Sequence, residues 1–460
     1  ASSFFLHRWL ETAPPDERIL VLERGVDRPH AWYVEHRDQI ANLAAATFEN
    51  RTPRKVWVYT VGFGGGSNCW WACTPRMLPE DFELDTRYGV GANWPIGYDD
   101  LEGYYCDVEE LMAIAGDDHG PVPRSRPYPL PPHLLSATDE VLKQAYPDEL
   151  FPQPTARASR NVAGQRLACC ANGTCHACPI DAKFRISNGL MEPYEDPRVE
   201  LRTDAQVLAV EVEGGTARGV RYASAGEEVV VDGDLVVLGA NAIFNPEILL
   251  RSGLDGPLVG RGVTEQVSVS FDVDIGGPDS FGGSTSITGH GYMLYGGDHR
   301  RDRAAGLMEL YNVPLRGLRR DRGAWRHRLE IKVIYEDLRN DESRVELSGD
   351  GSRPAVSFAG MSDYTKRAIA RSAEDLERVL APFDIQAMRT VGVAATEAHV
   401  LGSVVMGDDP TTSVVDAQMV HHQVRNLVVA GGSAFPTAAP ANPTLTISAL
   451  ARRSADRLSS

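Results

Sequence analysis

His399-Val-Leu-Gly-Ser-Val-Val-Met-Gly407, a histidine in a glycine-rich turn, precedes the apolar strand sequence Asn426-Leu-Val-Val-Ala-Gly-Gly-Ser433 and the helix sequence Ala441-Asn-Pro-Thr-Leu-Thr-Ile-Ser-Ala-Leu450. A strand that ends on glycines lets a bound group approach the backbone closely. A helix with Pro at its first position offers free N–H groups and the positive end of its dipole. The three segments together predict a cofactor site formed by a strand end, a helix start and a histidine.

Length and charge limit what the rest of the chain can do. The 460 residues are 43% hydrophobic and 24% charged, which suits two or three globular domains. A net charge of −17 argues against nucleic acid and anionic membranes as partners. No apolar run is long enough for an integral membrane protein. Because the chain begins at Ala1 without a methionine, a periplasmic location stays open beside the favoured cytoplasmic one.

An apolar strand ending on an acid is predicted at Arg18-Ile-Leu-Val-Leu-Glu23-Arg24-Gly25. In dinucleotide-binding folds, the acid that binds the ribose hydroxyls follows the glycine-rich phosphate loop by about 20 residues. Counting back from Glu23 places that loop at or before residue 1, so we expect it upstream of the given sequence. The alternative is that Glu23 is a surface acid at the end of an ordinary strand.

A second glycine-dense segment, Val61-Gly-Phe-Gly-Gly-Gly-Ser67-Asn68-Cys69-Trp70, could place a flat ring system against the backbone. The bulky Trp70, Trp71 and Pro75 that follow argue against a merely flexible loop. Further strands are predicted at 203–212, 219–224 and 234–239, and a helix at 246–252. Between them and the C-terminal segments, strands at 267–275, 328–335, 343–348 and 355–358 and a helix at 363–380 predict an antiparallel sheet with helices.

These segments resemble the glucose–methanol–choline (GMC) family of FAD-dependent alcohol oxidoreductases, nearest its pyranose 2-oxidase and bacterial FAD glucose, fructose and gluconate dehydrogenase branches. The spacing of His399, Gly402, Met406, Gly407, Gly432, Ser433, Pro436, Asn442, Pro443 and Thr444 matches the family. The resemblance implies an α/β fold with a discontinuous Rossmann-like FAD-binding domain and an α+β substrate domain. The FAD-binding domain would comprise 1–110, 165–265 (with a Cys-rich insertion at about 165–185) and 390–460; 111–164 would connect, and 266–389 would bind substrate.

The resemblance also implies the cofactor-binding residues: Glu23, Arg24, Gly64, Gly65, Ser67, Asn68, Cys69, Val207, Ala240, Asn241, Gly431, Gly432, Pro443 and Thr444. Cys69 stands where the pyranose oxidase branch has a histidine that carries the flavin covalently. A thioether to the flavin and an unmodified cysteine are both open, with the second favoured. Asn241 replaces the usual glycine of a family signature, and Asn tolerates the left-handed backbone that the turn requires.

Two side chains suit the oxidation of an alcohol, which loses a hydroxyl proton and a hydride. In the family His399 would be the catalytic acid/base and Asn442 its partner, which holds the hydroxyl by hydrogen bonding. The alternatives are that His399 is structural and that Asn442 caps the following helix; Asn442 could do both.

The cysteine cluster Cys169-Cys170-Ala-Asn-Gly-Thr-Cys175-His-Ala-Cys178-Pro179 is the other unusual motif. Short cysteine loops with an intervening Gly and a following Pro suit an iron–sulfur cluster held by Cys169, Cys175 and Cys178, with Cys170 as an alternative ligand. The motif resembles the cluster-binding segment of the bacterial glucose and fructose dehydrogenases, with one residue fewer between its last two cysteines. Zinc with His176, a local Cys170–Cys175 disulfide and free thiols are the alternatives.

The sequence thus predicts an FAD-dependent enzyme that oxidises the CH–OH group of a sugar, polyol or related alcohol. With an iron–sulfur cluster, electrons would leave to a cytochrome or quinone partner; without one, oxygen or a soluble acceptor would take them. Two rival hypotheses are a non-catalytic metal-binding or interaction protein on a degraded flavoprotein scaffold and a lyase-like use of the histidine without redox chemistry.

Overall fold

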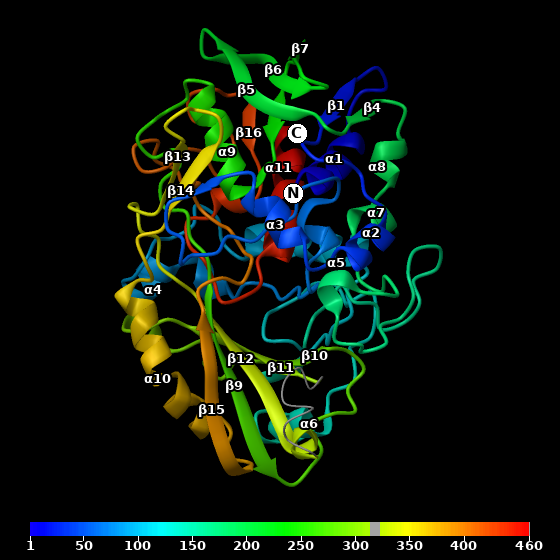
Figure 1. Ribbon diagram of the computed structural model, residues 1–460, viewed down its shortest axis with the longest axis vertical. Coiled ribbons are helices and arrows are strands. Elements are labelled where there is room, and N and C mark those ends of the chain that lie inside the picture. Colours follow the sequence, from blue (N-terminus) through cyan, green and yellow to red (C-terminus); the bar gives the residue numbers. More distant parts are fainter. Residues whose placement is uncertain (313–322, 460) are drawn as a thin grey trace.

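The computed structural model describes residues 1–312 and 323–459, and Figure 1 shows them as an elongated molecule with two lobes. One lobe carries the first and the last helix, α1 (Ser2–Leu10) and α11 (Thr444–Leu458), which pack against each other. The other lobe is built on a six-stranded sheet that α10 (Asp363–Val379) covers on one face. Among the described residues, no helix combines the length and apolar character needed to cross a membrane.

Two pairs of parallel strands lie in the first lobe. β1 (Ile19–Leu22) pairs with β4 (Val199–Arg202), and β16 (Leu427–Val429) pairs with β8 (Val236–Leu238). Their apolar sequences are typical of parallel strands that are covered on both faces. The α/β class expected from the sequence is confirmed. Across residues 1–312 and 323–459 the two pairs form separate sheets, so the Rossmann-like detail of the expected fold stays a prediction.

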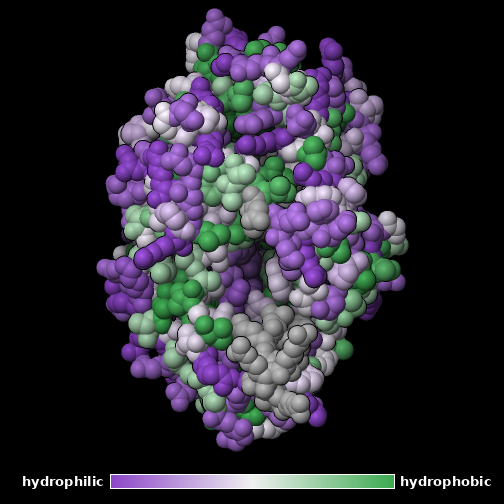
Figure 2. Space-filling view, in the orientation of Figure 1, coloured by the Kyte–Doolittle hydropathy of each residue, from purple (hydrophilic) through white to green (hydrophobic). Residues whose placement is uncertain are grey.

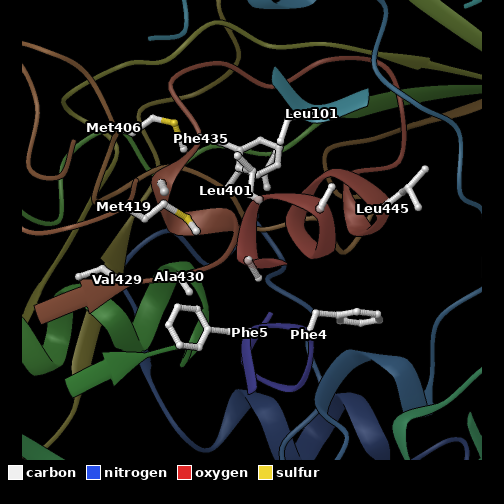
Figure 3. Packing of buried hydrophobic residues seen from close by; sticks show 14 of the residues in the cluster. Phe4, Phe5, Leu101, Leu401, Met406, Met419, Val429, Ala430, Phe435 and Leu445 are labelled. Atoms are coloured by element: carbon white, nitrogen blue, oxygen red, sulfur yellow. The ribbon is translucent and has the colours of Figure 1, made fainter. Parts of the chain in front are cut away.

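The core of this lobe joins the two ends of the chain. Figure 3 shows Phe4 and Phe5 of α1 in one buried cluster with Val429 and Ala430 at the end of β16 and with Leu445 of α11. Burial of each phenylalanine contributes about 1.5–3 kcal/mol. This packing fixes the glycine-rich end of β16 against the start of α1.

The first lobe also contains a three-stranded antiparallel sheet and a helix. The sheet has the order β5 (Gln206–Glu213), β6 (Thr216–Ser224) and β7 (Glu227–Asp232), so the hairpin predicted from residues 203–224 is confirmed. The predicted helix after β8 is α9, and it begins earlier than expected, spanning Asn241–Arg251.

The second lobe's sheet is antiparallel throughout, with strand order β15 (Asp384–Ala394), β9 (Val267–Gly276), β12 (Arg328–Tyr335), β11 (Gly306–Tyr311), β10 (Ile287–Gly291) and β3 (Leu150–Pro152). The strands predicted at 267–275 and 328–335 and the helix at 363–380 are confirmed. Side chains alternate between the faces: Leu329, Ile331 and Val333 pack with the core under α10, which leaves Glu330 and Lys332 on the opposite face.

The pair predicted at 343–358 is also present, as β13 (Arg344–Leu347) and β14 (Pro354–Ser357), with β2 (Glu49–Asn50) parallel to β14. Two strands of the large sheet come from outside the expected 266–389 range. β15 continues past residue 390, and β3 belongs to the segment expected to connect the domains. Residues 313–322 of the expected substrate domain lie outside the described residues.

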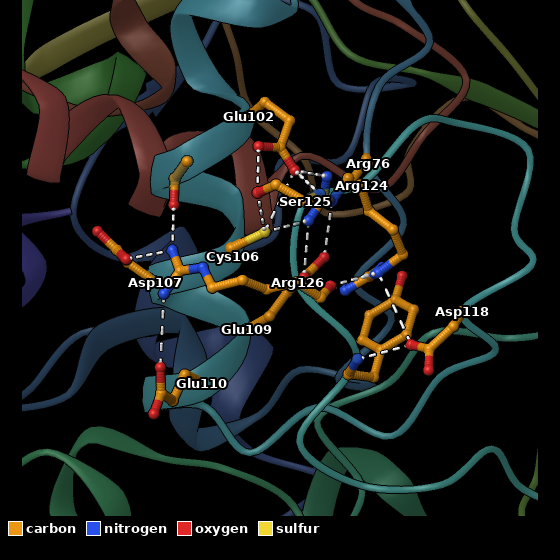
Figure 4. A network of polar contacts seen from close by, with 12 residues as sticks. Arg76, Glu102, Cys106, Asp107, Glu109, Glu110, Asp118, Arg124, Ser125 and Arg126 are labelled. Carbon is orange, nitrogen blue, oxygen red and sulfur yellow. Dashed lines mark hydrogen bonds and ion pairs between the residues drawn. The ribbon is translucent and has the colours of Figure 1, made fainter.

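Buried charges fasten the connecting segment to the first lobe. Figure 4 shows Arg76 and Arg124 converging on Glu109 of α5 (Asp99–Leu111). Arg76 donates to both Glu109 oxygens at 2.8 Å, and Arg124 donates to one of them at 2.7 Å. Charge-assisted bidentate bonds of this kind are strong when both partners are buried, so this network orders the chain around residues 118–128.

The remaining helices are short. The α-helices are α2 (His30–Glu35), α3 (Ile40–Ala45), α4 (Leu84–Tyr88), α6 (Ala137–Ala145), α7 (Ile186–Gly189) and α8 (Glu192–Glu195). The 3-10 helices are η1 (Gly65–Asn68), η2 (Pro79–Phe82), η3 (Cys175–Ala177), η4 (Asp298–Arg301), η5 (Ala324–His327) and η6 (Gly432–Ala434).

Candidate active site

A glutamine fixes the tautomer of His399. The imidazole Nδ1 lies 2.5 Å from Oε1 of Gln266, the residue before β9. The Gln266 amide nitrogen donates to the carbonyl oxygens of Ala439 and Ala441 at 2.5 and 2.8 Å, so the amide oxygen is the atom that faces the imidazole. Nδ1 therefore carries the hydrogen, and Nε2 carries a free lone pair. This arrangement leaves His399 ready to accept a proton at Nε2.

The electrostatic surroundings keep His399 neutral. Burial lowers the pKa of His399 to about 4, and this effect outweighs the nearby negative charge of Glu309, which acts in the opposite direction. A histidine with this pKa is unprotonated at neutral pH and can serve as a base.

A buried ion pair holds the backbone at His399. Glu265 Oε1 accepts hydrogen bonds from the His399 N–H at 2.8 Å and from the Thr396 hydroxyl at 2.9 Å. The other oxygen of Glu265 is paired with the Lys55 ammonium, and both side chains are buried. Lys55 comes from the N-terminal part of the chain, so the ion pair ties that part to the loop that carries His399.

The Asn442 side-chain amide nitrogen donates a hydrogen bond, whereas its oxygen has no partner among the described residues. Asn442 is 7% exposed, and its Nδ2 donates to Glu309 Oε1 at 3.4 Å, while its Oδ1 is buried and bonds to none of the described residues. An unpaired buried acceptor costs about 1–3 kcal/mol, which a hydrogen-donating ligand would recover. The expected alternative role as a helix cap is not observed, because α11 begins at Thr444 after Pro443 and no side chain caps it.

A row of polar side chains crosses the large sheet on the face that meets Asn442. His290, Glu309, Lys332 and Ser270 lie opposite one another on β10, β11, β12 and β9. Burial alone would raise the pKa of Glu309, but contact with His290 and the charge of Lys332 lower it to about 2. Glu309 is therefore ionised, and since a carboxylate only accepts hydrogen bonds, the nitrogen of Asn442 must face it.

Sequence reasoning missed Gln266, Glu265, Glu309 and Lys332. A single glutamine or glutamate in an alternating strand gives no signal by itself. Alternation places Glu330 and Lys332 on one face of β12, but only the pairing of the strands shows that Lys332 lies opposite Glu309.

The expected ribose-binding acid lies at the carboxyl end of β1. Glu23 Oε1 accepts from the backbone N–H of Gly25 at 2.7 Å, and burial raises the pKa of Glu23 against the effect of this bond. The neighbouring Arg24 guanidinium stacks over the Phe244 ring at 4.7 Å. A Cβ on Gly25 would lie 2.6 Å from the backbone of Gly62, so the glycine-dense segment passes directly beside the end of β1.

The glycine-dense segment is a compact turn. Gly64 has φ of +86° and leads into η1, where the Ser67 hydroxyl donates to the Gly64 carbonyl at 2.6 Å. Asn68 is buried and donates to the Phe63 carbonyl at 2.8 Å, and Cys69 is a half-buried free thiol. Gly65 also has positive φ, and a Cβ there would meet no atom within 4 Å.

The ends of β8 and β16 meet the start of α1. A Cβ on Gly239 would lie 1.9 Å from the Ser2 hydroxyl oxygen, and one on Gly431 would lie 3.5 Å from the Ala1 Cβ. Gly431 has φ of +109°, a conformation that favours glycine. Gly432 follows in η6, and Ala430 N–H donates to the Leu238 carbonyl at 2.7 Å, so both strand ends are held together.

Asn241 takes the backbone conformation that its family position requires. Its φ is +70°, and its Oδ1 accepts from the backbone N–H of Ile243 at 2.8 Å. The Asn241 side chain thus accepts a hydrogen bond from a free backbone N–H in the first turn of α9, which a glycine at this position could not do. Ala240 directly precedes this turn, and Val207 lies on β5 opposite Tyr222.

The cysteine-rich loop does not form the expected metal site. Across residues 1–312 and 323–459, no three His, Cys, Asp or Glu side chains are placed to hold a metal ion, and all seven cysteines are free thiols. The three expected ligands each contact a different neighbour: Cys169 the Thr285 hydroxyl at 3.5 Å, Cys175 the Ser286 hydroxyl at 3.2 Å, and Cys178 the Ala182 N–H at 3.4 Å. Cys170, the alternative ligand, is exposed, and the alternative Cys170–Cys175 disulfide is absent.

The strand ends fit an extended dinucleotide. Glu23, Gly239 and Gly431 follow the carboxyl ends of parallel strands, which is where open α/β folds bind their ligands. Tyr194 connects the two groups of turns, because its hydroxyl lies 2.7 Å from the Ser3 hydroxyl and its ring packs on Phe63 at 4.9 Å. Backbone turns and an acid at such an edge could hold a dinucleotide cofactor.

Comparisons with known proteins agree with this geometry. The family model of the GMC oxidoreductases matches residues 40–268 and 341–451. The chain is 27% identical to the fructose dehydrogenase large subunit of Gluconobacter japonicus, over 86% of this chain and 80% of that protein. It is 30% identical to paromamine 6'-oxidase of Streptomyces fradiae, over 95% and 86% respectively. The structure of pyridoxine 4-oxidase from Mesorbium loti shares the fold, with a TM-score of 0.68 at 18% identity over 99% of this chain and 96% of that one.

The fold and these relatives define a flavin-dependent oxidoreductase of the class that includes alcohol and sugar dehydrogenases and oxidases. The chain belongs to the GMC oxidoreductase family, as its sequence motifs indicated. The enzyme class expected from the sequence is likewise confirmed.

Proposed function

We propose that this enzyme oxidises a CH–OH group of a sugar, polyol or related alcohol, with His399 Nε2 taking the hydroxyl proton. FAD, when bound, supplies the acceptor for the hydride. The observation that carries the proposal is the contact between Gln266 and His399, which leaves the lone pair of a neutral imidazole on Nε2. A general base of this kind contributes about 10²- to 10⁴-fold to the rate of proton transfer.

Asn442 orients the substrate in this proposal. Its unpaired Oδ1 accepts a hydrogen bond from the substrate, and its nitrogen is held by Glu309. Gln266 links the two catalytic segments, because it bonds both His399 and the carbonyl of Ala441, directly before Asn442. One side chain thus fixes both groups relative to each other, which is what productive alignment requires.

The cofactor residues divide between two ends of the dinucleotide in this proposal. Glu23 binds the adenosine ribose, with Arg24 and Val207 on the same side. The flavin side is lined by the remaining expected residues: Gly64, Gly65, Ser67, Asn68, Cys69, Ala240, Asn241, Gly431, Gly432, Pro443 and Thr444. Because burial raises the pKa of the Cys69 thiol, which disfavours the reactive thiolate, we propose non-covalent binding. The FAD-binding domain then comprises 1–110, 165–265 and 390–460, and 266–389 forms the substrate domain.

The arrangement of the cysteine-rich loop bears on which electron acceptor the enzyme uses. Since its thiols form no ligand set among the described residues, oxygen or a soluble acceptor is favoured over a cytochrome or quinone reached through a cluster.

The proposed reaction is tested by mixing the flavin-loaded enzyme anaerobically with sugars and polyols and recording the visible absorption. Bleaching of the flavin bands by an alcohol, with the matching carbonyl product identified by mass spectrometry, supports the proposal. A loaded enzyme that no member of a broad alcohol and sugar panel reduces would contradict it.

A further inference from the structure

Glu309 is a buried carboxylate that lacks a directly bound cation. It is 3% exposed, and no lysine or arginine nitrogen in the described part of the chain lies within 4 Å of it. Its contacts are the Tyr311 hydroxyl at 3.1 Å, the Asn442 amide at 3.4 Å and His290 Nε2 at 3.8 Å. Burial lowers the pKa of His290, so that imidazole is neutral at neutral pH.

The two cationic side chains of this region are bound to other groups. Lys332 Nζ lies 2.9 Å from Glu397, so one ammonium serves two carboxylates, and Glu309 is the one it does not contact. Arg157 is fully buried, and its guanidinium donates to neutral acceptors, including the Thr285 hydroxyl at 2.7 Å and the Ile287 carbonyl at 3.1 Å. The Gln153 side chain bonds both Arg157 and His290, and so lies between the guanidinium and Glu309.

Three hydrogen-bond acceptors lie at and around Asn442. His399 presents Nε2, Asn442 presents Oδ1, and Glu309 presents a carboxylate. A neutral sugar or polyol supplies one hydrogen from each hydroxyl, of which His399 takes one in the proposed reaction, but it supplies no positive charge. An ammonium group carries three donors and a positive charge, and so can satisfy both remaining acceptors.

We propose that the alcohol oxidised by this enzyme carries an ammonium group near the reacting carbon, as in an amino sugar or amino alcohol, and that Glu309 binds this ammonium. The inference rests on the proposed function and adds its substrate class and specificity residue. A desolvated carboxylate without a directly bound cation is costly even when it has hydrogen-bond partners, and a cationic substrate offsets more of that cost than a neutral hydroxyl does, because both partners of the hydrogen bond are then charged. Asn442, held between Glu309 and the substrate, then accepts a hydrogen bond from the ammonium or from an adjacent hydroxyl.

The first test uses substrate pairs that differ only in the amine. We expect a higher kcat/KM for anaerobic flavin reduction with D-glucosamine than with D-glucose, and with D-galactosamine than with D-galactose. N-acetyl-D-glucosamine, which lacks the charge, should lose the advantage. Glu309→Gln keeps the side-chain shape and an oxygen for Asn442, and should reduce the amino-to-neutral kcat/KM ratio about 10- to 100-fold, as expected for one charge-assisted hydrogen bond. Tyr311→Phe removes a partner of Glu309 but not its charge, and should keep the preference.

The second test measures binding without the reaction. Cyclohexylammonium has no oxidisable hydroxyl, so titration calorimetry should show that it binds the wild-type enzyme more tightly than cyclohexanol, and that Glu309→Gln removes the difference. Equal kcat/KM within the sugar pairs, or cyclohexylammonium binding that Glu309→Gln leaves unchanged, overturns the inference while flavin reduction by sugars still supports the proposed function. Ammonium binding that depends on Glu309 without any flavin reduction overturns the proposed reaction and keeps the ammonium site.

Discussion

Gln266 Oε1 lies 2.5 Å from His399 Nδ1, and this contact decides which imidazole nitrogen is available to the substrate. The glutamine is itself held by the carbonyl oxygens of Ala439 and Ala441, so its orientation is not free. The same residue therefore sets the tautomer of the base and fixes the segment that leads to Asn442. A catalytic histidine whose second nitrogen is held in this way is preorganised for proton transfer.

Replacing the glutamine should separate these two roles. Gln266→Leu cannot accept from Nδ1, so the tautomer is no longer fixed, and we expect flavin reduction to slow by up to about 100-fold, a large part of a general base's contribution. Gln266→Glu still accepts from Nδ1, but its charge favours the protonated imidazole. Because a carboxylate cannot donate to the Ala439 and Ala441 carbonyls, it should recover only part of the rate lost in Gln266→Leu, and it should move the acidic limb of the pH–rate profile to higher pH. Stopped-flow pH profiles of both variants check this; identical profiles in Gln266→Glu and wild type would count against the contact.

Acid should destabilise the protein through a histidine outside the site. His133 is 3% exposed, its Nδ1 and Nε2 lie 2.9 Å from Ser284 Oγ and 3.0 Å from the Arg157 carbonyl oxygen, and burial lowers its pKa from 6.5 to about 4. As the pH falls, His133 is protonated in the unfolded chain before it is protonated in the folded protein. The contribution of the neutral imidazole to the free energy of unfolding is therefore complete above pH 6.5 and declines as the pH falls to about 4. From 1.36 kcal/mol per pKa unit, the loss is at most about 3 kcal/mol.

Denaturant unfolding between pH 7 and pH 4 measures this slope. His133→Gln should flatten the dependence, whatever it does to the stability at pH 7. An unchanged slope in His133→Gln would show that this imidazole is not the group that titrates.

The buried charge network of Figure 4 should be sensitive to the loss of one partner. Arg76→Met leaves the ionised Glu109 buried beside Arg124 only, and we expect a loss of about 3–5 kcal/mol in the free energy of unfolding. Arg87 forms an exposed ion pair with Glu83 at 2.7 Å, so Arg87→Met is a matched control with a loss of about 0–1 kcal/mol. Equal effects of the two changes would contradict the buried network.

The state of the cysteines can be checked by visible spectroscopy of the flavin-loaded enzyme. Because burial raises the pKa of the Cys69 thiol and so disfavours a thioether to the flavin, acid precipitation should release the flavin into the supernatant. The anaerobically purified, loaded enzyme should show flavin bands without a broad iron–sulfur shoulder. Colour retained in the pellet would indicate a covalent flavin, and stoichiometric iron and sulfide would restore the cluster.

Local sequence patterns predicted many of the elements. The alternation in residues 328–335 predicted β12, and Asn241 was expected to tolerate the left-handed conformation that it adopts. The site depended on pairing between distant strands, which local patterns do not encode. Glu309 lies opposite Lys332 through strand register, and Gln266 contacts His399 across 133 positions. The cysteine spacing was wrong as a guide to a ligand set, because Thr285 and Ser286 of another segment contact two of the thiols.

The most direct test of the account is the rate of anaerobic flavin reduction by an alcohol substrate in His399→Asn, with His422→Asn as a control. The account predicts that His399→Asn keeps its flavin and is reduced about 10²- to 10⁴-fold more slowly than wild type, as the loss of a general base requires, while His422→Asn is reduced at the wild-type rate. A His399→Asn enzyme that binds flavin and is reduced as fast as wild type would contradict the role of His399.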